Sequence, residues 1–505
     1  MHPLILLALL QVGNVGAQHA APLPQNAAPP QSHPTTCYEV FVRSFYDSNG
    51  DGIGDLPGLT QKLDYISGLG ADCVWLMPIA ESPSYHGYDV TDYYKVEPDY
   101  GTNDDFKAFV AAAHQHKIRV LVDLVLNHTS SEHPWFQEAL RDTTAPHRGW
   151  YRWAPTQGGA CPNNWHKSPV RDECYFGLFW SGMPDLNYEN PAVLDEMKRV
   201  ARVWLDSMHV DGFRLDAVRH LVEVGNEVSN TPGTHQVLRD FGQYVRGIAP
   251  QSYTIGEVWD NPDVILTYYP DQLDAYFAFP ISEALIEAVR TGKAGGLLPT
   301  VEQFQRAEPA YRWAPFQRNH DQTRAMTALA NDTAGARLAV TILLTLPGVP
   351  FVYYGEEIGM TGDKPDERLR TPMQWTASSR GFTSGKPWET LQADTLTANV
   401  AAQERRPNSL LKLYRWLMRL RGNDAALRDG RLEPVETGND ALLAYMRKDG
   451  TAQVLVVANL GTTPATLAVP GRFSYRSLLT AGRTRASLPT LQPRTAYIYE
   501  ITQRP

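Results

Sequence analysis

Three carboxylates each end a short apolar run of this sequence. They are Asp216 in Val210-Asp-Gly-Phe-Arg-Leu-Asp216, Glu257 in Tyr253-Thr-Ile-Gly-Glu257, and Asp321 in Phe316-Gln-Arg-Asn-His-Asp321. A strand that ends on an acid beside His or Arg places charge at the rim of a parallel barrel, where the chemistry of such a fold is located. A single acid more often caps a helix or forms a surface ion pair. Because three acids share the pattern, we expect them to form one active site.

The neighbours of these acids predict different protonation states. Arg214 lies two positions before Asp216, on the same face of a strand, and an adjacent guanidinium keeps a carboxylate ionised, as a nucleophile requires. Glu257 follows an apolar run, and apolar surroundings raise the pKa of a carboxyl so that it can deliver a proton to a leaving oxygen. Asp321 follows His320, a donor that could join it in binding the hydroxyls of a distorted sugar ring. The pattern therefore favours hydrolysis of a glycosidic bond.

Composition is consistent with a globular enzyme. The chain has 505 residues, of which 43% are hydrophobic and 20% are charged. This length fits about three domains, or one barrel with additions. The formal net charge is -9 and the pI is near 5.9, without a dense run of Lys and Arg. We therefore expect no nucleic-acid partner.

The first residues predict export. The apolar run Leu4–Leu10 and the small-residue pattern ending at Ala17 are typical of a secretory signal peptide over residues 1–17. Residues 18–34 are rich in Ala, Pro and Gln and predict a flexible leader. The remaining sequence contains no apolar stretch of roughly 18 residues, so stable membrane insertion is not expected. The protein is expected to be secreted, to the extracellular space or the periplasm.

Four cysteines are compatible with two disulfides in an exported chain. Cys161 and Cys174 bracket a stretch rich in Pro and Asn, where a covalent bond would restrain irregular structure, and their spacing favours this pair. Cys37 and Cys73 begin the first two expected strands. They either pair or remain buried thiols.

The order of elements predicts an α/β fold, a (β/α)8 TIM barrel. Short β-branched runs alternate with amphipathic helical stretches such as 104–117, 192–208 and 333–346. The eight expected strands are Glu39–Phe45, Cys73–Met77, Val120–Val125, Gly212–Leu215, Tyr253–Gly256, Ala275–Phe279, Ala314–Gln317 and Phe351–Tyr354.

Two further domains interrupt and follow this alternation. Residues 128–184 contain no clean helical pattern and predict a small domain inserted after the third strand, so the barrel comprises residues 35–127 and 185–424. Residues 425–505 change to strict alternation, which predicts a C-terminal antiparallel β-sandwich domain.

Several segments resemble the signature motifs of the α-amylase family of glycoside hydrolases, family 13. The matching segments are Asp123-Leu-Val-Leu-Asn-His128, Met183-Pro-Asp-Leu-Asn187, Gly212-Phe-Arg-Leu-Asp-Ala-Val-Arg-His220, Gly256-Glu-Val258 and Asn319-His-Asp321. The resemblance implies that Asp216 is the nucleophile, Glu257 the general acid and base, and Asp321 the stabiliser of the transition state. It also implies that the sugar in the cleavage subsite is held by His128, Arg214 and His320. Such enzymes retain anomeric configuration, so the carboxyls of nucleophile and acid are expected roughly 5 to 5.5 Å apart.

Two other segments fit the same subsite. Tyr88 is placed like the family's stacking aromatic residue, and Asp89 like an acid that binds an outer hydroxyl. Arg370 resembles an arginine that pairs with this acid in related glucosidases. If both bind the ring, they partly close the non-reducing end of the cleft. The alternative is a solvated arginine and a structural aspartate.

A loop after the first strand presents oxygen atoms at alternating positions. The resemblance assigns a structural Ca²⁺ to Asp47, Asn49, Asp51, the Ile53 carbonyl and Asp55. Gly58 stands where an EF-hand has its bidentate Glu, and a turn held only by Asx hydrogen bonds is the alternative. Many α-amylases hold a second ion between barrel and inserted domain. The corresponding residues here are Asn127, Asp185 and His220.

The motifs combine features of several branches of the family. Ala217 and His220 are as in α-amylases, whereas Arg219 stands where those enzymes usually have Lys. We expect a monomeric α-amylase of an intermediate subfamily that hydrolyses internal α-1,4 bonds of starch and maltooligosaccharides. An exo-acting α-glucosidase or oligo-1,6-glucosidase is the first alternative, and a trehalose synthase-like enzyme the second. A catalytically inactive barrel that only binds glycan or another protein is disfavoured because all three acids are present.

Overall fold

Eight parallel strands form a barrel in the computed structural model, which describes residues 33–479 and 484–504. Their order is β12-β11-β10-β9-β5-β2-β1-β13, and a parallel bridge between Phe316 and Phe351 joins the two ends of the sheet. The strands are β1 Cys37–Val40, β2 Cys73–Leu76, β5 Arg119–Leu124, β9 Gly212–Leu215, β10 Tyr253–Gly256, β11 Ala275–Phe277, β12 Trp313–Ala314 and β13 Phe351–Tyr353. The expected TIM barrel is confirmed. The signal peptide and all but the last two residues of the leader lie outside the described residues.

Two of the eight strands end three or more residues before their expected bounds, and four others differ by one or two residues. The first was expected over 39–45 but ends at Val40, because residues 42–44 form a 3-10 turn in which the Ser44 N–H donates to the Phe41 carbonyl. The seventh was expected over 314–317 but ends at Ala314. Pro315 follows, and it has no N–H to donate to a ladder. Both corrections arise from hydrogen bonding of the backbone rather than from hydrophobic pattern.

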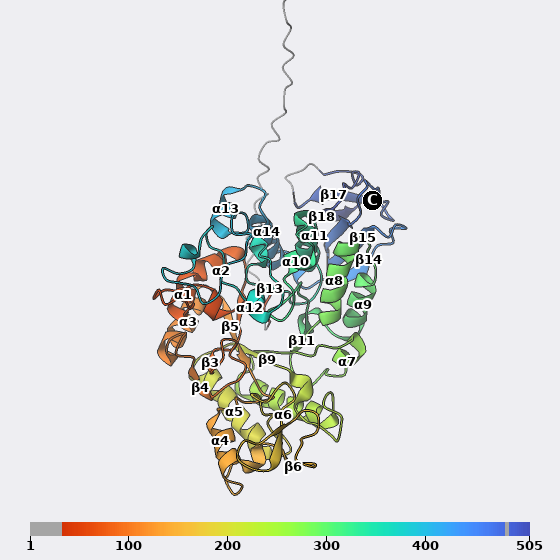
Figure 1. The fold of residues 1–505 in the computed structure, drawn as a ribbon. Helices are drawn as coiled ribbons and strands as arrows, with labels where there is room; N and C mark the ends of the chain where they lie inside the picture. The colour runs from red at the N-terminus through yellow and green to blue at the C-terminus, as the bar shows by residue number, and fades with distance from the viewer. Residues whose placement is uncertain (1–32, 480–483, 505) are drawn as a thin grey trace, which may run out of the picture.

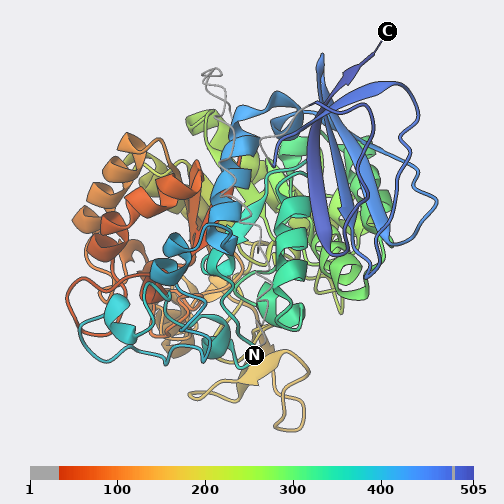
Figure 2. The same cartoon turned by 90° about the horizontal axis from the view of Figure 1, so that it is seen from above.

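Helices follow the strands and cover the barrel (Figures 1 and 2). The three expected amphipathic stretches form α3 Asn103–Gln115, α5 Pro191–Asp206 and α11 Thr333–Leu343, each with a capping side chain at its first turn. The other helices are α1 Leu56–Gln61, α2 Leu63–Leu69, α4 Pro134–Arg141, α6 Pro232–Ile248, α7 Pro262–Leu266, α8 Phe279–Thr291, α9 Leu297–Ala307, α10 Ala325–Ala328, α12 Asp366–Leu369, α13 Val400–Arg405, α14 Leu410–Asn423 and α15 Ala425–Arg428.

The segment after β5 forms a small antiparallel sheet. Its strands are β6 Trp153–Pro155, β8 Glu173–Phe176 and β7 Trp165–Lys167, in that order, and the expected disulfide joins Cys161 to Cys174. The segment also contains α4, although the sequence showed no clean helical pattern there. His133 caps this helix and Pro134 occupies its first position, which sets the start of a helix of only 8 residues. A short hairpin of β3 Ala80–Glu81 and β4 Asp92–Val96 lies after β2.

In the described part of the C-terminal region, the expected antiparallel pairing is confirmed, but the second sheet of the expected β-sandwich is not formed. Within the described residues the region forms a single five-stranded sheet with the order β14-β15-β16-β18-β17. Its strands are β14 Arg431–Pro434, β15 Leu442–Asp449, β16 Ala452–Asn459, β17 Phe473–Ser477 and β18 Thr495–Gln503. The sheet lies beside α8 and α11 at the end of the molecule away from α4 and β6 (Figure 1). Buried Arg447 connects it to the barrel by donating to the Thr345 carbonyl at 2.6 Å.

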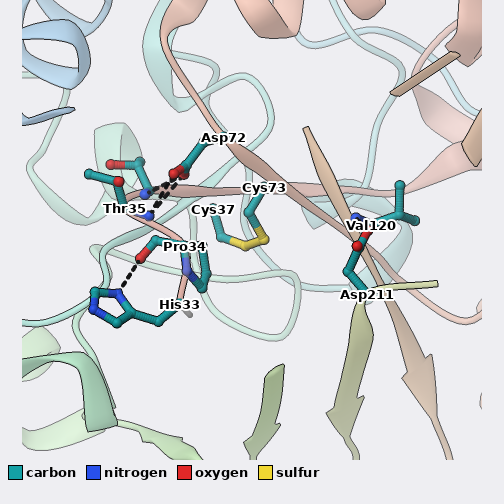
Figure 3. Close-up of a disulfide and its surroundings, with 9 residues drawn as sticks. His33, Pro34, Thr35, Cys37, Asp72, Cys73, Val120 and Asp211 are labelled. Carbon is teal, nitrogen blue, oxygen red and sulfur yellow. Dashed lines mark hydrogen bonds between the residues drawn. A yellow bond between two sulfur atoms is a disulfide. The ribbon is translucent and has the colours of Figure 1, made fainter. Parts of the chain in front are cut away.

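A second disulfide joins Cys37 to Cys73, so this pair is not a set of buried thiols. The two residues face each other in the parallel register of β1 and β2, and Figure 3 shows the bond beside the start of the barrel. The Asp72 carboxylate accepts hydrogen bonds from the N–H groups of Thr35 and Thr36 at 2.9 Å. These bonds fix the entry of the chain into β1. Among the described residues, no helix has both the length and the apolar character needed to cross a membrane.

Candidate active site

Arg214 is the centre of the candidate site. Its side chain is 1% exposed, and it lies in β9 directly opposite Asp123 of β5. Nη1 donates to both Asp123 oxygens at 3.0 and 2.9 Å and to Asp216 Oδ1 at 2.6 Å. Nη2 lies 2.8 Å from Glu257 Oε2. Two of the three predicted acids therefore share one buried guanidinium.

The adjacent strands β9 and β10 bring Asp216 and Glu257 to this position. Each acid directly follows its strand, and the strands pair in parallel register. Ala217, the next residue, has φ 46° and ψ 35°, a left-handed conformation that is uncommon for a residue other than glycine. Its N–H donates to Glu257 Oε2 at 3.1 Å. The turn after Asp216 thus also orients Glu257.

Glu257 has the electrostatic surroundings expected of a proton donor. Burial raises the pKa of its carboxyl, the Arg214 guanidinium opposes this shift, and the negative charges of Asp216 and Asp321 add to it. The net direction is upward, as the sequence predicted. At 12% exposure, the side chain can still reach a bound substrate.

Asp321 has the opposite surroundings. Burial alone would raise the pKa of its carboxyl, but the charges of His320 and Arg370 lower it well below its usual range. Arg370 Nη2 donates to Asp321 Oδ1 at 2.8 Å. The side chain is 33% exposed, which makes it the most accessible of the three acids. An ionised and accessible carboxylate can bind hydroxyls or positive charge that develops on a sugar.

The pairing expected for Arg370 is wrong in the described contacts. Asp89 accepts hydrogen bonds from Ser82 and Ser84 instead. Arg370 is committed to Asp321 through Nη2 and to the His320 carbonyl through Nε at 3.1 Å. The clamp anticipated between residues 89 and 370 is therefore not formed. Arg370 nevertheless lies in the site, through a partner that the motif did not suggest.

Two aromatic side chains expected at the sugar subsite lie beside each other. The rings of Tyr88 and His320 stack with centroids 5.7 Å apart, and Tyr88 Oη lies 2.6 Å from His320 Nε2. His128 is 2% exposed, and its Nε2 has no hydrogen-bond partner among the described residues. Burial lowers the pKa of His128 to about 4, so its ring is neutral at pH 7. A buried polar atom without a protein partner calls for a donor or acceptor that the protein does not supply, such as a water or a ligand.

Two buried acids in the site were not among the residues assigned from the sequence. Asp123 was quoted only as the start of a motif, and Glu39 only as the start of a strand. Both lie inside otherwise apolar strands, and Glu39 Oε1 is 2.6 Å from His320 Nδ1. A lone charged residue within a buried strand is a signal that could have identified them, because such a charge needs a buried partner.

The proposed calcium loop is held by its own hydrogen bonds. Asp47 accepts from the N–H groups of Asn49, Gly50 and Gly52, and Asp51 accepts from that of Ile53. Asp55 caps α1 through Gly58 N–H. Bonds of this kind agree with the Asx-turn alternative. Nowhere in the described chain do three or more His, Cys, Asp or Glu side chains gather as a metal cluster.

The residues expected to hold a second ion include buried oxygens without hydrogen-bond partners in the described chain. Asn127 Oδ1 and Asp185 Oδ2 are buried and lack hydrogen-bond partners within residues 33–479 and 484–504. The His220 ring pairs its Nδ1 with the Val228 carbonyl at 2.7 Å. The two unpaired acceptors, Asn127 Oδ1 and Asp185 Oδ2, are consistent with a bound donor or ion. The third expected residue, His220, already pairs its Nδ1 with the protein backbone.

Comparison with known proteins agrees with the geometry. The family model described as alpha amylase, catalytic domain, matches residues 39–430. Alpha-amylase 3 of Dictyoglomus thermophilum is 41% identical over 84% of this chain and 84% of its own length. Trehalose synthase/amylase TreS of Mycolicibacterium smegmatis is 36% identical over 85% of this chain and 84% of its own length. The crystal structure of the alpha-amylase from H. orenii superposes with a TM-score of 0.82 at 38% identity and covers 93% of this chain and 99% of that one. The chain is therefore a member of the α-amylase family of glycoside hydrolases, family 13.

Proposed function

We propose that this glycoside hydrolase is an α-amylase that cleaves internal α-1,4 bonds of starch and maltooligosaccharides with retention of configuration. The observation that carries the proposal is the placement of Asp216 and Glu257 on opposite nitrogens of one buried guanidinium, with distances of 2.6 and 2.8 Å. A retaining mechanism needs two carboxyls close together in different protonation states. Arg214 contacts Asp216 directly, and burial raises the pKa of Glu257, which favours a proton on that acid.

The reaction proceeds in two displacements. Asp216 Oδ attacks the anomeric carbon while Glu257 transfers its proton to the glycosidic oxygen, so the C–O bond breaks and the shortened glucan leaves. A covalent glycosyl ester on Asp216 remains. Glu257, now ionised, takes a proton from water, and the resulting hydroxide attacks the same carbon and releases Asp216. Asp321, held ionised by His320 and Arg370, stabilises positive charge on the ring in both transition states.

The preference for internal bonds is supported by the state of Arg370. Because Arg370 pairs with Asp321 rather than Asp89, the clamp that would narrow the non-reducing end is not formed. An end without this clamp would accept a longer chain on both sides of the scissile bond. The name of the Dictyoglomus thermophilum relative also supports an amylase.

A trehalose synthase-like activity is the second candidate. A relative named trehalose synthase/amylase covers 85% of this chain. Arg219 replaces the Lys usual in α-amylases and donates to the Trp259 carbonyl at 2.6 Å, so its guanidinium is not free for a leaving glucose. An altered leaving-group side is what an isomerising enzyme requires, since the released sugar must stay bound. The oligo-1,6-glucosidase alternative is supported by a relative of that name that is 31% identical over 87% of this chain.

The proposal includes export and a structural Ca²⁺. Export is supported by the disulfides Cys37–Cys73 and Cys161–Cys174, since disulfides persist in oxidising compartments. The ion would be held by Asp47, Asn49, Asp51, the Ile53 carbonyl and Asp55, whose oxygens are of the type that Ca²⁺ prefers. Bound there, it would supply structural stability and take no part in the chemistry.

Product analysis decides between the candidates. Purified enzyme is incubated with soluble starch, maltose and isomaltose, and the products are followed by timed chromatography. Mixed maltooligosaccharides from starch support the proposal. Glucose alone, or hydrolysis of isomaltose, would favour an exo-glucosidase, and trehalose from maltose would favour the isomerising enzyme.

Two substitutions test the assigned acids. Asp216→Asn and Glu257→Gln are expected to abolish turnover while the far-UV circular dichroism is unchanged. Glu287→Gln, on the exposed face of α8, is the matched control and should keep full activity. Unchanged turnover in either active-site variant would exclude the assigned mechanism.

A further inference from the structure

Glu39 is a buried carboxylate that the two-displacement mechanism does not use. It lies in β1 among Cys37, Tyr38 and Val40, and it is 1% exposed. A buried carboxylate is costly unless a charge or strong donor compensates it. The compensating donor is the ring of His320, whose Nδ1 lies 2.6 Å from Glu39 Oε1. The strand therefore places a charge directly behind a residue of the sugar subsite.

We propose that Glu39 is a positioning residue that holds His320 as a doubly protonated imidazolium, which in turn fixes Asp321 and Tyr88 for catalysis. The inference deepens the proposed function and rests on it, because Asp321 is taken as the stabiliser of the transition state. Glu39 itself touches no substrate atom in this scheme. It acts through the imidazole.

The contacts on the other ring nitrogen require a proton there. His320 Nε2 lies 3.1 Å from Asp321 Oδ2 and 2.6 Å from Tyr88 Oη. A neutral ring with its proton on Nδ1 would turn a lone pair toward the Asp321 carboxylate, which is repulsive. With a proton on each nitrogen, His320 donates both to Glu39 and to the Asp321 and Tyr88 oxygens. Both sides of the ring are then satisfied.

The same proton arrangement links the ring to the catalytic pair. Tyr88 Oη accepts from His320 and is left free to donate to Asp123 Oδ2, at 3.2 Å. Asp123 in turn binds Arg214, which holds Asp216. If His320 lost its charge, Tyr88 would donate to Nε2 instead, and Asp123 would lose this bond. A continuous set of hydrogen bonds thus runs from β1 to the nucleophile.

The charges around His320 agree with a retained proton. Glu39 from β1 and Asp321 from the following position face its two nitrogens, Asp123 of β5 lies beyond Tyr88, and Arg370 donates Nε to its carbonyl oxygen. The ring also contacts Trp75 edge-on at 5.6 Å. Burial lowers the pKa of His320, but the charges of Asp321 and Glu39 outweigh burial and raise this pKa to about 9.

The test replaces Glu39 by Gln, which has the same shape and no charge. The titration of the His320 imidazole is followed by NMR in the full-length enzyme, with His320→Gln used to assign its signal. We expect the titration midpoint to fall by at least one pH unit in Glu39→Gln and to stay near that of the wild type in Glu39→Asp. The alkaline limb of kcat should shift by the same amount, and KM should change much less.

The matched control is Glu357→Gln. Glu357 is also a fully buried carboxylate, but it accepts from Tyr38 and Tyr65 outside the site. Its loss should lower the melting temperature without moving the pH profile. A purely structural role of Glu39 would give that same pattern in Glu39→Gln, and this result would overturn the proposal.

Two readouts keep this inference separate from the proposed function. The NMR titration needs no substrate, so it decides the role of Glu39 even if the wild type hydrolyses no glucan. In that case the proposed function fails while the positioning role stands. If Glu39→Gln does not fold, Glu39→Asp remains informative. A midpoint in Glu39→Asp that is more than one pH unit below that of the wild type would contradict charge compensation by this residue.

Discussion

Replacing Arg214 by Met tests the central element of the site. The side chain is 1% exposed and makes ion pairs with Asp123, Asp216 and Glu257. Removing one partner of a buried ion pair costs about 3 to 5 kcal/mol, because the remaining charge is buried without compensation. We expect the free energy of unfolding to fall by about this amount at pH 8.

The loss should be smaller at lower pH. Burial already raises the pKa of Asp123 to about 7 against the opposing charge of Arg214, so without the arginine this carboxyl is protonated at still higher pH. A carboxyl whose pKa is raised in the folded state destabilises the fold as pH rises, because the unfolded chain releases its proton first. The variant should therefore be closer to the wild type at pH 5 than at pH 8.

A second variant is expected to recover stability but not turnover. Asp123→Asn combined with Arg214→Met removes the buried charge of Asp123 and should recover part of the lost stability. Turnover should stay at least about 100-fold below that of the wild type, because loss of one pre-organised hydrogen-bond donor typically has an effect of this size. In this variant no guanidinium holds Asp216 or Glu257. Urea unfolding followed by tryptophan fluorescence and kcat on maltoheptaose measure the two effects. Recovery of turnover in the double variant would refute the role given to Arg214.

Three further outcomes are expected. Removal of Ca²⁺ by a chelator should lower the melting temperature, and added Ca²⁺ should restore it. The Asp47→Asn variant should respond to neither treatment. A wild-type melting curve that the chelator does not change would count against the proposed ion. Arg447→Met leaves the Thr345 and Gly430 carbonyls without this donor. Each unpaired buried carbonyl should lower the free energy of unfolding by about 1 to 3 kcal/mol, so the melting temperature should fall without a change in KM. Because the pKa of His320 is raised to about 9, its protonation stabilises the fold fully below pH 6.5, and this contribution is lost as the pH rises through about 9. The melting temperatures of the wild type and His320→Gln should therefore become more similar over that pH range.

The positions of Asp216 and Glu257 could be predicted because they depend on local pattern. Each acid directly follows a short apolar strand, and parallel strands of a barrel end at one face. Arg214 followed from the two-residue period of a strand, which places it on the same side as Asp216. The eight strands followed from short β-branched runs between helical stretches, with the largest errors where Pro315 or a 3-10 turn ended the ladder.

Partners that come from distant segments could not be predicted in this way. Glu39 and His320 are separated by 281 positions, and only closure of the barrel brings them together. Arg370 and Asp321 are 49 positions apart, in loops whose paths the hydrophobic pattern does not determine. α4 was missed because its 8 residues span barely two turns, too few to show a periodic signal.

The partner of Arg370 bears directly on which bond the enzyme cleaves. Arg370 is 3% exposed and donates Nη2 to Asp321 at 2.8 Å, Nε to the His320 carbonyl at 3.1 Å and Nη1 to the Tyr85 hydroxyl at 3.3 Å, so none of its nitrogens is directed to Asp89. Breaking a buried ion pair is costly, and it would also remove a charge that keeps Asp321 ionised. All three nitrogens of this guanidinium are therefore engaged by Asp321, His320 and Tyr85. Under the proposed function, an arginine engaged in this way does not clamp the non-reducing end, which suits cleavage within a chain better than removal of single terminal glucose units.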